Sequence, residues 1–166
     1  MAIMRQIGKQ ILTIAALAAI SAIIGVPLPV AAGSLATKFV TDPLTGVAID
    51  GYDPVSYFTE PEPQLGKPDF EYYWGGVPWY FENKANRDAF IKHPEVYAPQ
   101  YGGHCQTSLA RGYLSDGKPR VYVVAADRLY LFYSTANRDA FLLSPVASAK
   151  SAIARWAEFS ADFVTN

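Results

Sequence analysis

The sequence predicts an α+β fold in which two β-hairpin–helix units form a small antiparallel sheet with helices packed on it, preceded by a signal peptide. An internal repeat supports this prediction, as do aromatic runs on either side of tight turns and an apolar segment near the start of the chain. The 166 residues include 11 Tyr, 9 Phe and 3 Trp. So many aromatic side chains in so short a chain indicate a compact domain with an aromatic core.

The first 32 residues have the three parts of a secretory signal peptide. Arg5 and Lys9 form a positive end, an apolar run follows over 11–26, and small residues precede a cleavage site after Ala32 or Ala36. We therefore expect a periplasmic or secreted protein. The alternative is that the apolar run is retained as a membrane anchor, because its length is near the ~20 residues that span a bilayer.

The charge of the chain argues against two classes of partner. The sequence has 14 basic and 15 acidic residues, and loss of the two basic residues in the signal peptide leaves 12 against 15, a net charge of about −3. We therefore expect no nucleic-acid binding and no stable membrane association after cleavage. The remaining chain divides into an N-terminal extension over 33–45 and one folded domain over 46–166.

An internal duplication defines the two units of the domain and covers 70–94 and 121–145. The hexapeptide Ala-Asn-Arg-Asp-Ala-Phe at 85–90 returns unchanged at 136–141. Aromatic and β-branched runs precede it in both copies, which is typical of half-buried strands. Each copy therefore predicts a strand, a tight turn, a second strand and a short helix.

Local signals mark the boundaries of these elements. Gly75-Gly76 predicts a hairpin turn, and Ala126-Asp127 occupies the matching position in the second copy. Asn83 and Ser134 are good helix N-caps. Because neither hairpin can bury its apolar face alone, we expect the two to pair or pack into one antiparallel sheet. The expected strands are 70–74, 79–81, 121–125 and 130–132.

The duplication is flanked by further predicted elements. Ser144 as N-cap and Pro145 as first residue begin a longer helix. Asp53, followed by a proline, is expected to cap a helical turn that reaches residue 58. The stretch Thr59–Pro68 is expected to be a solvated loop. Residues at helical spacing in the long helix are expected to pack into the core: Ala149, Ile153, Trp156 and Phe159 or Phe163.

Between the two copies lies a segment, 99–118, that has no counterpart in this pattern and contains the only cysteine, Cys105. Gly102-Gly103 permits positive φ, and Gln106–Arg111 can form a short helix that a glycine ends. Cys105 would then lie at a helix N-terminus, where free N–H groups stabilise a thiolate. The alternative is that Cys105 is a small hydrophobic residue in the core.

The cysteine count narrows the chemistry. With one cysteine no internal disulfide can form, so Cys105 either pairs with another molecule or is retained as a thiol. His104 is a candidate ligand beside it. His93 aligns with the capping residue Ser144 in the duplication, which favours a polar turn residue over a ligand. We find no phosphate-binding glycine loop, metalloprotease helix or serine nucleophile motif.

Four segments form one extended pattern: Gly51–Phe58, Trp79–Phe81, Asn86–Phe90 and His93–Gly103, followed by Cys105. With this pattern the chain resembles the YHS-domain proteins, in particular the exported group described as YHS-domain (seleno)proteins. The resemblance covers about residues 46–133.

This resemblance implies a site at Cys105 where a soft, nucleophilic chalcogen matters, because some members use selenocysteine at that position. Related metal-binding modules of the TRASH type have cysteines around the second hairpin strand and the following helix. The segment 81–86 has none, so their metal site does not carry over. His104 departs from the aromatic residue expected there.

Three functions follow from these observations. The first is a non-catalytic exported domain that binds copper or zinc through Cys105, with His104, His93 and Asp53 as further candidate ligands. One cysteine falls short of a four-ligand site, so a second subunit, Asp53 or a tyrosine would have to complete it. The second is a thiol-based redox protein in which Cys105 is the nucleophile and an external thiol completes turnover. The third is an interaction domain, with a structural cysteine or a homodimeric disulfide.

Overall fold

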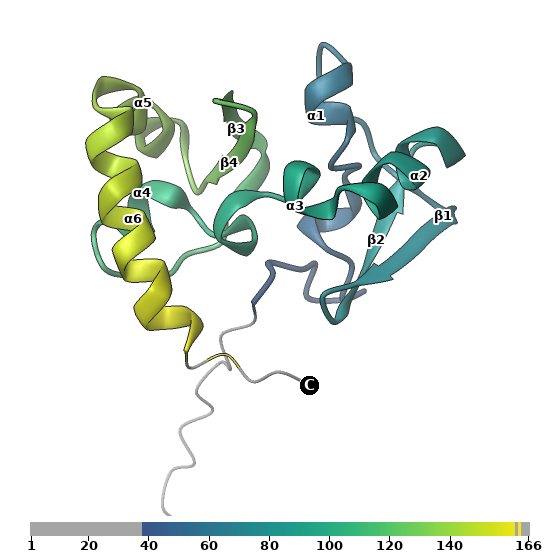
Figure 1. The fold of residues 1–166 in the computed structure, drawn as a ribbon, viewed down its shortest axis with the longest axis horizontal. Coiled ribbons are helices and arrows are strands. Elements are labelled where there is room, and N and C mark those ends of the chain that lie inside the picture. The colour runs from purple at the N-terminus through teal and green to yellow at the C-terminus, as the bar shows by residue number, and fades with distance from the viewer. Residues whose placement is uncertain (1–37, 162, 164–166) are drawn as a thin grey trace, which may run out of the picture. The chain divides into compact units, whose positions relative to one another are not determined.

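The hairpin and helix signals in the sequence produce the predicted α+β fold (Figure 1). The computed structural model describes residues 38–161 and residue 163, so the predicted signal peptide lies outside the described residues. The elements of the first half are η1 (Ile49–Gly51), α1 (Ser56–Thr59), β1 (Lys67–Trp74), β2 (Val77–Phe81), α2 (Lys84–Lys92) and α3 (Pro94–Tyr97). Those of the second half are η2 (Gln100–Gly103), α4 (Gln106–Ala110), β3 (Lys118–Ala125), β4 (Arg128–Phe132), α5 (Thr135–Leu143) and α6 (Pro145–Ser160).

The same order of elements therefore occurs twice. A 3₁₀ turn, a short helix, a hairpin and two further helices follow one another in 49–97, here called the first repeat, and again in 100–160, the second repeat. The hairpins have matching registers, since Tyr72 pairs with Trp79 and Val123 with Tyr130. An irregularity near the start of the longer strand is also present in both.

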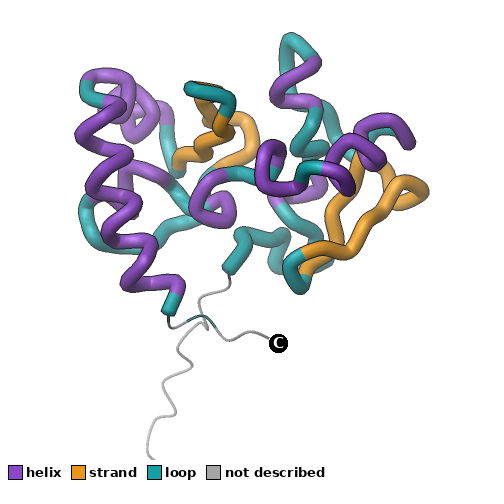
Figure 2. The backbone as a smooth tube through the Cα atoms, viewed as in Figure 1, coloured by secondary structure: helices purple, strands orange, loops and turns teal. Residues whose placement is uncertain are grey.

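The two hairpins do not join into the single sheet that the sequence analysis expected. Among the described residues β1 pairs with β2 and β3 with β4, as two separate antiparallel sheets (Figure 2, orange). The hairpins meet through side chains instead, because Leu129 and Leu131 of β4 are fully buried in the aromatic cluster of the first repeat. Packing thus replaces backbone pairing between the repeats.

Helices α2 and α5 begin at the predicted caps. The Asn83 side chain accepts a hydrogen bond from the Asn86 N–H at 2.9 Å, and the Ser134 hydroxyl accepts one from the Asn137 N–H at 3.3 Å. These bonds satisfy N–H groups that have no partner within the helix. Ser144 occupies the N-cap position of α6 as predicted, but its side chain makes no capping hydrogen bond.

Two local predictions are corrected. Helix α1 begins only at Ser56, and Asp53 Oδ1 accepts a hydrogen bond from the Val55 N–H at 2.8 Å in the turn that leads into it. On α6, Ile153 is 62% exposed, and the fully buried position is Ala152. The predicted stripe is therefore wrong at this one position, since Trp156 and Phe159 contact the core as expected.

The predicted solvated loop is mostly exposed, as expected. Its last residues, however, belong to strand β1, which begins at Lys67. The core of the first repeat is built largely from aromatic side chains. Trp79 and Phe90 are fully buried with ring centroids 5.2 Å apart. Such packed aromatic pairs add to the free energy of burial.

Candidate functional site

The segment around Cys105 has a structural counterpart in the first repeat, although the sequence analysis treated 99–118 as an insertion. Gly51 and Gly103 both have positive φ, at 77° and 88°, and each follows a residue that also has positive φ. The Gly66 N–H bonds to the carbonyl of Gly51, and the Gly117 N–H bonds to that of Gly103. The positive φ explains a glycine at 51 and 103, since other residues adopt this conformation only with strain.

The match places Asp53 and Cys105 at equivalent positions. The Asp53 N–H donates to the carbonyl of Gln64 at 2.8 Å, and the Cys105 N–H donates to the carbonyl of Ser115 at the same distance. Each residue follows a bridge residue, since Tyr52 pairs with Leu65 and His104 pairs with Asp116. Both side chains are fully buried. The duplication therefore extends through the cysteine segment.

In the first repeat, three groups hold the Asp53 carboxylate. Oδ1 accepts from the Val55 N–H at 2.8 Å, and Oδ2 accepts from the Glu82 N–H at 2.9 Å and from the Asn86 side-chain amide at 2.6 Å. We call these three groups the first donor set. They tie the segment before α1 to the end of β2 and the start of α2, so a buried carboxylate connects three elements of the repeat.

In the second repeat, a matching group of donors surrounds the Cys105 sulfur. The Asn137 amide donates to Sγ at 3.2 Å. The Ser108 side chain, the Ser108 main chain and the Tyr133 main chain lie close enough to lower the pKa of the thiol. We call these four groups the second donor set. Asn137 is the counterpart of Asn86 in the repeated hexapeptide, and Tyr133 is the counterpart of Glu82 at the end of the hairpin.

The second donor set favours the ionised sulfur. Burial acts to raise the pKa of the Cys105 thiol, but the hydrogen bonds from Ser108, Asn137 and the Tyr133 main chain together outweigh it and hold the pKa below its usual value. Hydrogen bonds to the charged form stabilise that form. The sequence analysis expected a thiolate supported by a helix N-terminus. Ser108, in the first turn of α4, is one of the groups that lower the pKa, and Asn137 and Tyr133 add contributions from two other segments.

The sulfur is enclosed by apolar side chains. Cys105 is fully buried and packs with Phe132 of β4 and Phe141 of α5. The two rings lie with centroids 5.4 Å apart. Because these rings cover the sulfur, a reagent reaches it only when this part of the domain opens locally.

His104 faces away from this cluster. Its imidazole lies 5.9 Å from the Trp156 ring and stacks on Phe163 at 6.2 Å. Its Nδ1 lies 3.8 Å from the Asp116 carboxylate. His104 and Cys105 are adjacent in extended backbone, so their side chains enter different clusters. The imidazole thus packs against α6, whereas the thiol packs between β4 and α5.

The other predicted ligands do not join Cys105. The His93 side chain is 64% exposed at the junction of α2 and α3, where it lies 3.7 Å from the Glu95 carboxylate. Asp53 is held by the first donor set. Within the part of the chain that the structure describes, no three residues among His, Cys, Asp and Glu form a group that could hold a metal ion. The described residues therefore do not bring the predicted ligands together around Cys105.

Sequence reasoning missed the asparagines of the repeated hexapeptide and the serines before the hairpins. Asn86 and Asn137 carry the side-chain hydrogen bonds to positions 53 and 105. A signal for them was present, because Gly51 and Ser56 have the same spacing as Gly103 and Ser108. It was hidden because the connection from that serine to the first strand is one residue shorter in the second repeat.

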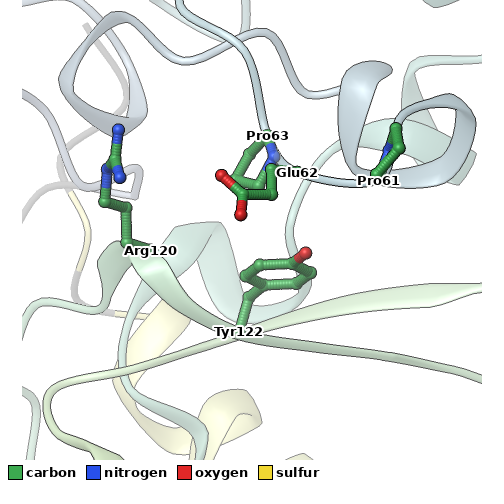
Figure 3. A pocket seen from close by; sticks show the side chains of 5 residues that line it. All are labelled: Pro61, Glu62, Pro63, Arg120 and Tyr122. Carbon is green, nitrogen blue, oxygen red and sulfur yellow. The ribbon is translucent and has the colours of Figure 1, made fainter.

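A pocket on the surface lies apart from these residues. It has a volume of about 340 Å³ and is lined by Pro61, Glu62, Pro63, Arg120 and Tyr122 (Figure 3). The Arg120 Nε donates to the Tyr52 hydroxyl at 2.8 Å. Tyr122 packs edge-on against Tyr57. The pocket thus lies between the exposed loop after α1 and strand β3, and none of the predicted site residues lines it.

Two findings bear on the class of protein. No helix in the described part of the chain is both long and apolar enough to cross a lipid bilayer. No protein-family model, curated protein or solved structure matches this chain.

Proposed function

We propose that this protein is an exported YHS-like domain that acts through thiol redox chemistry, with Cys105 as the nucleophile, a small hydroperoxide as oxidant and an external thiol as reductant. The observation that supports it is the replacement of a carboxylate by a thiol in two matching donor sets. Asp53 already satisfies the structural demands of this position in the first repeat. The fold therefore does not require sulfur at position 105.

The second donor set supplies the reactivity that such a thiol needs. The thiolate is the nucleophilic form of cysteine, and its fraction at neutral pH rises as the pKa falls. Hydrogen bonds from Ser108, Asn137 and Tyr133 lower the pKa of Cys105. The donors also hold the sulfur in one orientation, which favours attack along a fixed direction.

The enclosure of the sulfur favours a small oxidant. Phe132 and Phe141 pack against Cys105, and a local opening that admits a hydroperoxide need not admit a disulfide on a folded protein. We therefore place hydroperoxides ahead of protein disulfides as substrates. We therefore expect a slow reaction, because the oxidant reaches the sulfur only when the β4–α5 region opens.

Each step is a balanced two-electron reaction. The thiolate attacks a peroxide oxygen, the S–O bond forms as the O–O bond breaks, and the leaving alkoxide or hydroxide takes a proton from solvent. Cys105 becomes a sulfenic acid. An external thiol then attacks the sulfur, water leaves, and a second external thiol releases Cys105 from the mixed disulfide. The external thiol is required because Cys105 is the only cysteine in the sequence.

Copper or zinc binding, the first function that the sequence suggested, has less support. The groups around Sγ are N–H and O–H donors, which bind an anion and not a metal ion. A second subunit would have difficulty in supplying ligands to Cys105, because the sulfur is fully buried. Metal binding to this chain would require the second donor set to rearrange.

The test compares the wild-type protein with Cys105→Ser and Cys105→Asp. Each protein is expressed as the full chain. After purification it is treated with stoichiometric hydrogen peroxide and a reagent that traps sulfenic acids. We expect the trap to label the wild type at Cys105, and a small thiol added in place of the trap to restore the free thiol. Neither variant should consume peroxide. Native mass spectrometry with elemental analysis is run on the same samples.

Two results would contradict the proposal. One is a wild-type thiol that peroxide leaves unmodified at concentrations that oxidise an unfolded cysteine peptide. The other is stoichiometric copper or zinc in the wild type that is lost in Cys105→Ser, which would establish the metal-binding function instead.

A further inference from the structure

We infer that Cys105 is a site of oxidation to a sulfinate, and that the protein in this state is more stable than in its reduced state because the second repeat then holds a two-oxygen anion as the first repeat does. The inference rests on the proposed thiol chemistry, which it extends to a second oxidation step. The second observation that supports it is independent of the cysteine. The matching donor set of the first repeat holds a carboxylate.

The first repeat shows how such an anion is held. Asp53 presents two oxygens: one accepts from the Val55 N–H, and the other accepts from the Glu82 N–H and the Asn86 amide. A cysteine sulfinate also presents two oxygens and one negative charge, on a sulfur one bond from Cβ. It is therefore the oxidised form of cysteine that most resembles an aspartate side chain.

The second repeat has a counterpart for each of these donors. The Thr107 N–H corresponds to that of Val55, the Tyr133 N–H to that of Glu82, and the Asn137 amide to that of Asn86. Asn137 already donates to the sulfur in the reduced protein at 3.2 Å, and the Tyr133 main chain lies close enough to lower the pKa of the thiol. Ser108 adds a hydroxyl that has no equivalent among the groups that hold the Asp53 carboxylate. A sulfinate at position 105 would thus find at least as many donors as the Asp53 carboxylate has.

The chemistry requires only a second equivalent of the same oxidant. The sulfenate sulfur attacks a second hydroperoxide, a new S–O bond forms as the O–O bond breaks, and the sulfur is oxidised by two more electrons. The proton of the sulfinic acid passes to the leaving alkoxide or hydroxide. The products are the sulfinate and an alcohol or water. This step is not reversed by thiols.

The enclosure of the sulfur favours this second oxidation over reduction of the sulfenic acid by an external thiol. A peroxide needs to approach one lone pair of the sulfur, whereas a thiol needs to form a disulfide that carries its whole side chain into the space under Phe132 and Phe141. Overpacking a close-packed cluster in this way is costly. As the ratio of peroxide to thiol rises, the sulfinate accumulates. Because thiols do not reduce it, the fraction of sulfinate at Cys105 reflects the earlier exposure of the protein to oxidant.

The test measures product and stability together. Wild-type protein is treated with increasing hydrogen peroxide, and intact and peptide mass spectrometry identify the adduct at Cys105. Thermal unfolding is followed before and after treatment. We expect an adduct of two oxygen atoms and a Tm above that of the reduced protein. Cys105→Asp, a permanent carboxylate, should also unfold above Cys105→Ser without any treatment.

Two matched variants show whether the change in Tm on oxidation depends on the second donor set. In Asn137→Ala, which removes one donor, the two-oxygen adduct should raise the Tm less than in wild type. In Asn86→Ala, which removes the corresponding donor from Asp53, the Tm gain on oxidation should equal that of the wild type. Each comparison is between the reduced and oxidised states of one variant, so a general loss of stability does not affect it.

The outcomes distinguish this inference from the proposed function. Oxidation that stops at the sulfenic acid or a mixed disulfide would overturn the inference and leave the thiol chemistry standing. A two-oxygen adduct that lowers the Tm would overturn it as well. A thiol that does not react with peroxide would overturn both.

Discussion

Asp53 and Cys105 are buried in matching places, but a carboxylate and a thiol differ in what they offer to the donors around them. A carboxylate offers two oxygens and is charged at neutral pH, whereas a thiol offers one weakly accepting sulfur unless it ionises. The second donor set therefore gains most from Cys105 when the sulfur is a thiolate. The charge state of one residue thus links the stability of the second repeat to its reactivity.

This link predicts how position 105 tolerates substitution. Cys105→Asp should leave the free energy of unfolding within about 1 kcal/mol of the wild type, because the donors gain a charged partner. Cys105→Leu should cost about 1–3 kcal/mol, because it leaves several buried N–H and O–H groups without an acceptor. Urea unfolding at neutral pH measures both. Equal stability of the two variants would contradict the donor-set account.

The thiolate also predicts a pH dependence of stability. The folded pKa of Cys105 is lowered, whereas an unfolded cysteine ionises at about 8.5. The contribution of Cys105 is therefore fully present above that value and is lost as the pH falls through the folded pKa. We expect the stability difference between wild type and Cys105→Ser to grow with rising pH and to level off above about 8.5. A pH-independent difference would show that the thiol ionises alike in both states.

At this scale the sequence predicted less than the structure shows. Cys105 stood out because it is the only cysteine, and the glycines beside it indicated a special backbone. Its partners did not stand out, because Asn137 and Tyr133 lie some thirty residues further along the chain. Contacts between residues so far apart in the sequence depend on how the hairpin folds back on the chain. Local sequence patterns do not predict this.

At the scale of elements, local signals were sufficient for the hairpins and their helices. The Gly75-Gly76 turn and the caps at Asn83 and Ser134 lie where the sequence placed them. The shortest helices were less predictable, since α1 begins three residues after the expected cap at Asp53. A four-residue helix is stabilised by its tertiary contacts and not by its own propensity.

The two helix caps predict that removal of either capping side chain lowers the stability of the domain. Asn83→Ala and Ser134→Ala should each lower the free energy of unfolding by about 1 kcal/mol. The bond of Asn83 is the shorter, at 2.9 Å against 3.3 Å, so its loss should be the larger of the two. Urea unfolding of the two single variants checks this order. A neutral Asn83→Ala would contradict the capping role.

At the scale of the whole domain, the described residues unfold as one unit on this account. The cluster around Trp79 in the first repeat includes Leu129 and Leu131 of the second. Because each repeat buries apolar side chains of the other, neither core is complete alone. The sequence predicted two dependent units, but it could not show that side chains and not paired strands connect them.

This shared core predicts cooperative unfolding. Leu131→Ala should cost about 2–5 kcal/mol and should shift the loss of structure in both repeats together. Trp156→Phe leaves Trp74 and Trp79 as fluorescent probes of the first repeat, while circular dichroism reports on all helices. We expect coincident transitions by both probes. Separate midpoints would show that the first repeat unfolds by itself.

The buried tyrosines predict the alkaline limit of the fold. Burial, aided by Tyr130, raises the pKa of Tyr101 to about 12. Burial also raises the pKa of Tyr57, whose hydroxyl donates to the Pro119 carbonyl at 2.9 Å. A raised folded pKa gives stability that is full below the unfolded value of about 10 and is lost as the pH rises toward the folded value. Tyr57→Phe should therefore lose less of its free energy of unfolding than the wild type as the pH rises above ~10. An unchanged alkaline midpoint would contradict this.

The most direct test of the central claim is a pH titration of the Cys105 thiolate by its ultraviolet absorbance, in wild type and in Asn137→Ala, with Asn86→Ala as control. We expect the wild type and Asn86→Ala to ionise below the ordinary cysteine value of about 8.5, and Asn137→Ala to ionise at a higher pH than both. A wild-type thiol that ionises at or above that value, or one that Asn137→Ala leaves unchanged, would contradict the claim that the second donor set holds an anion.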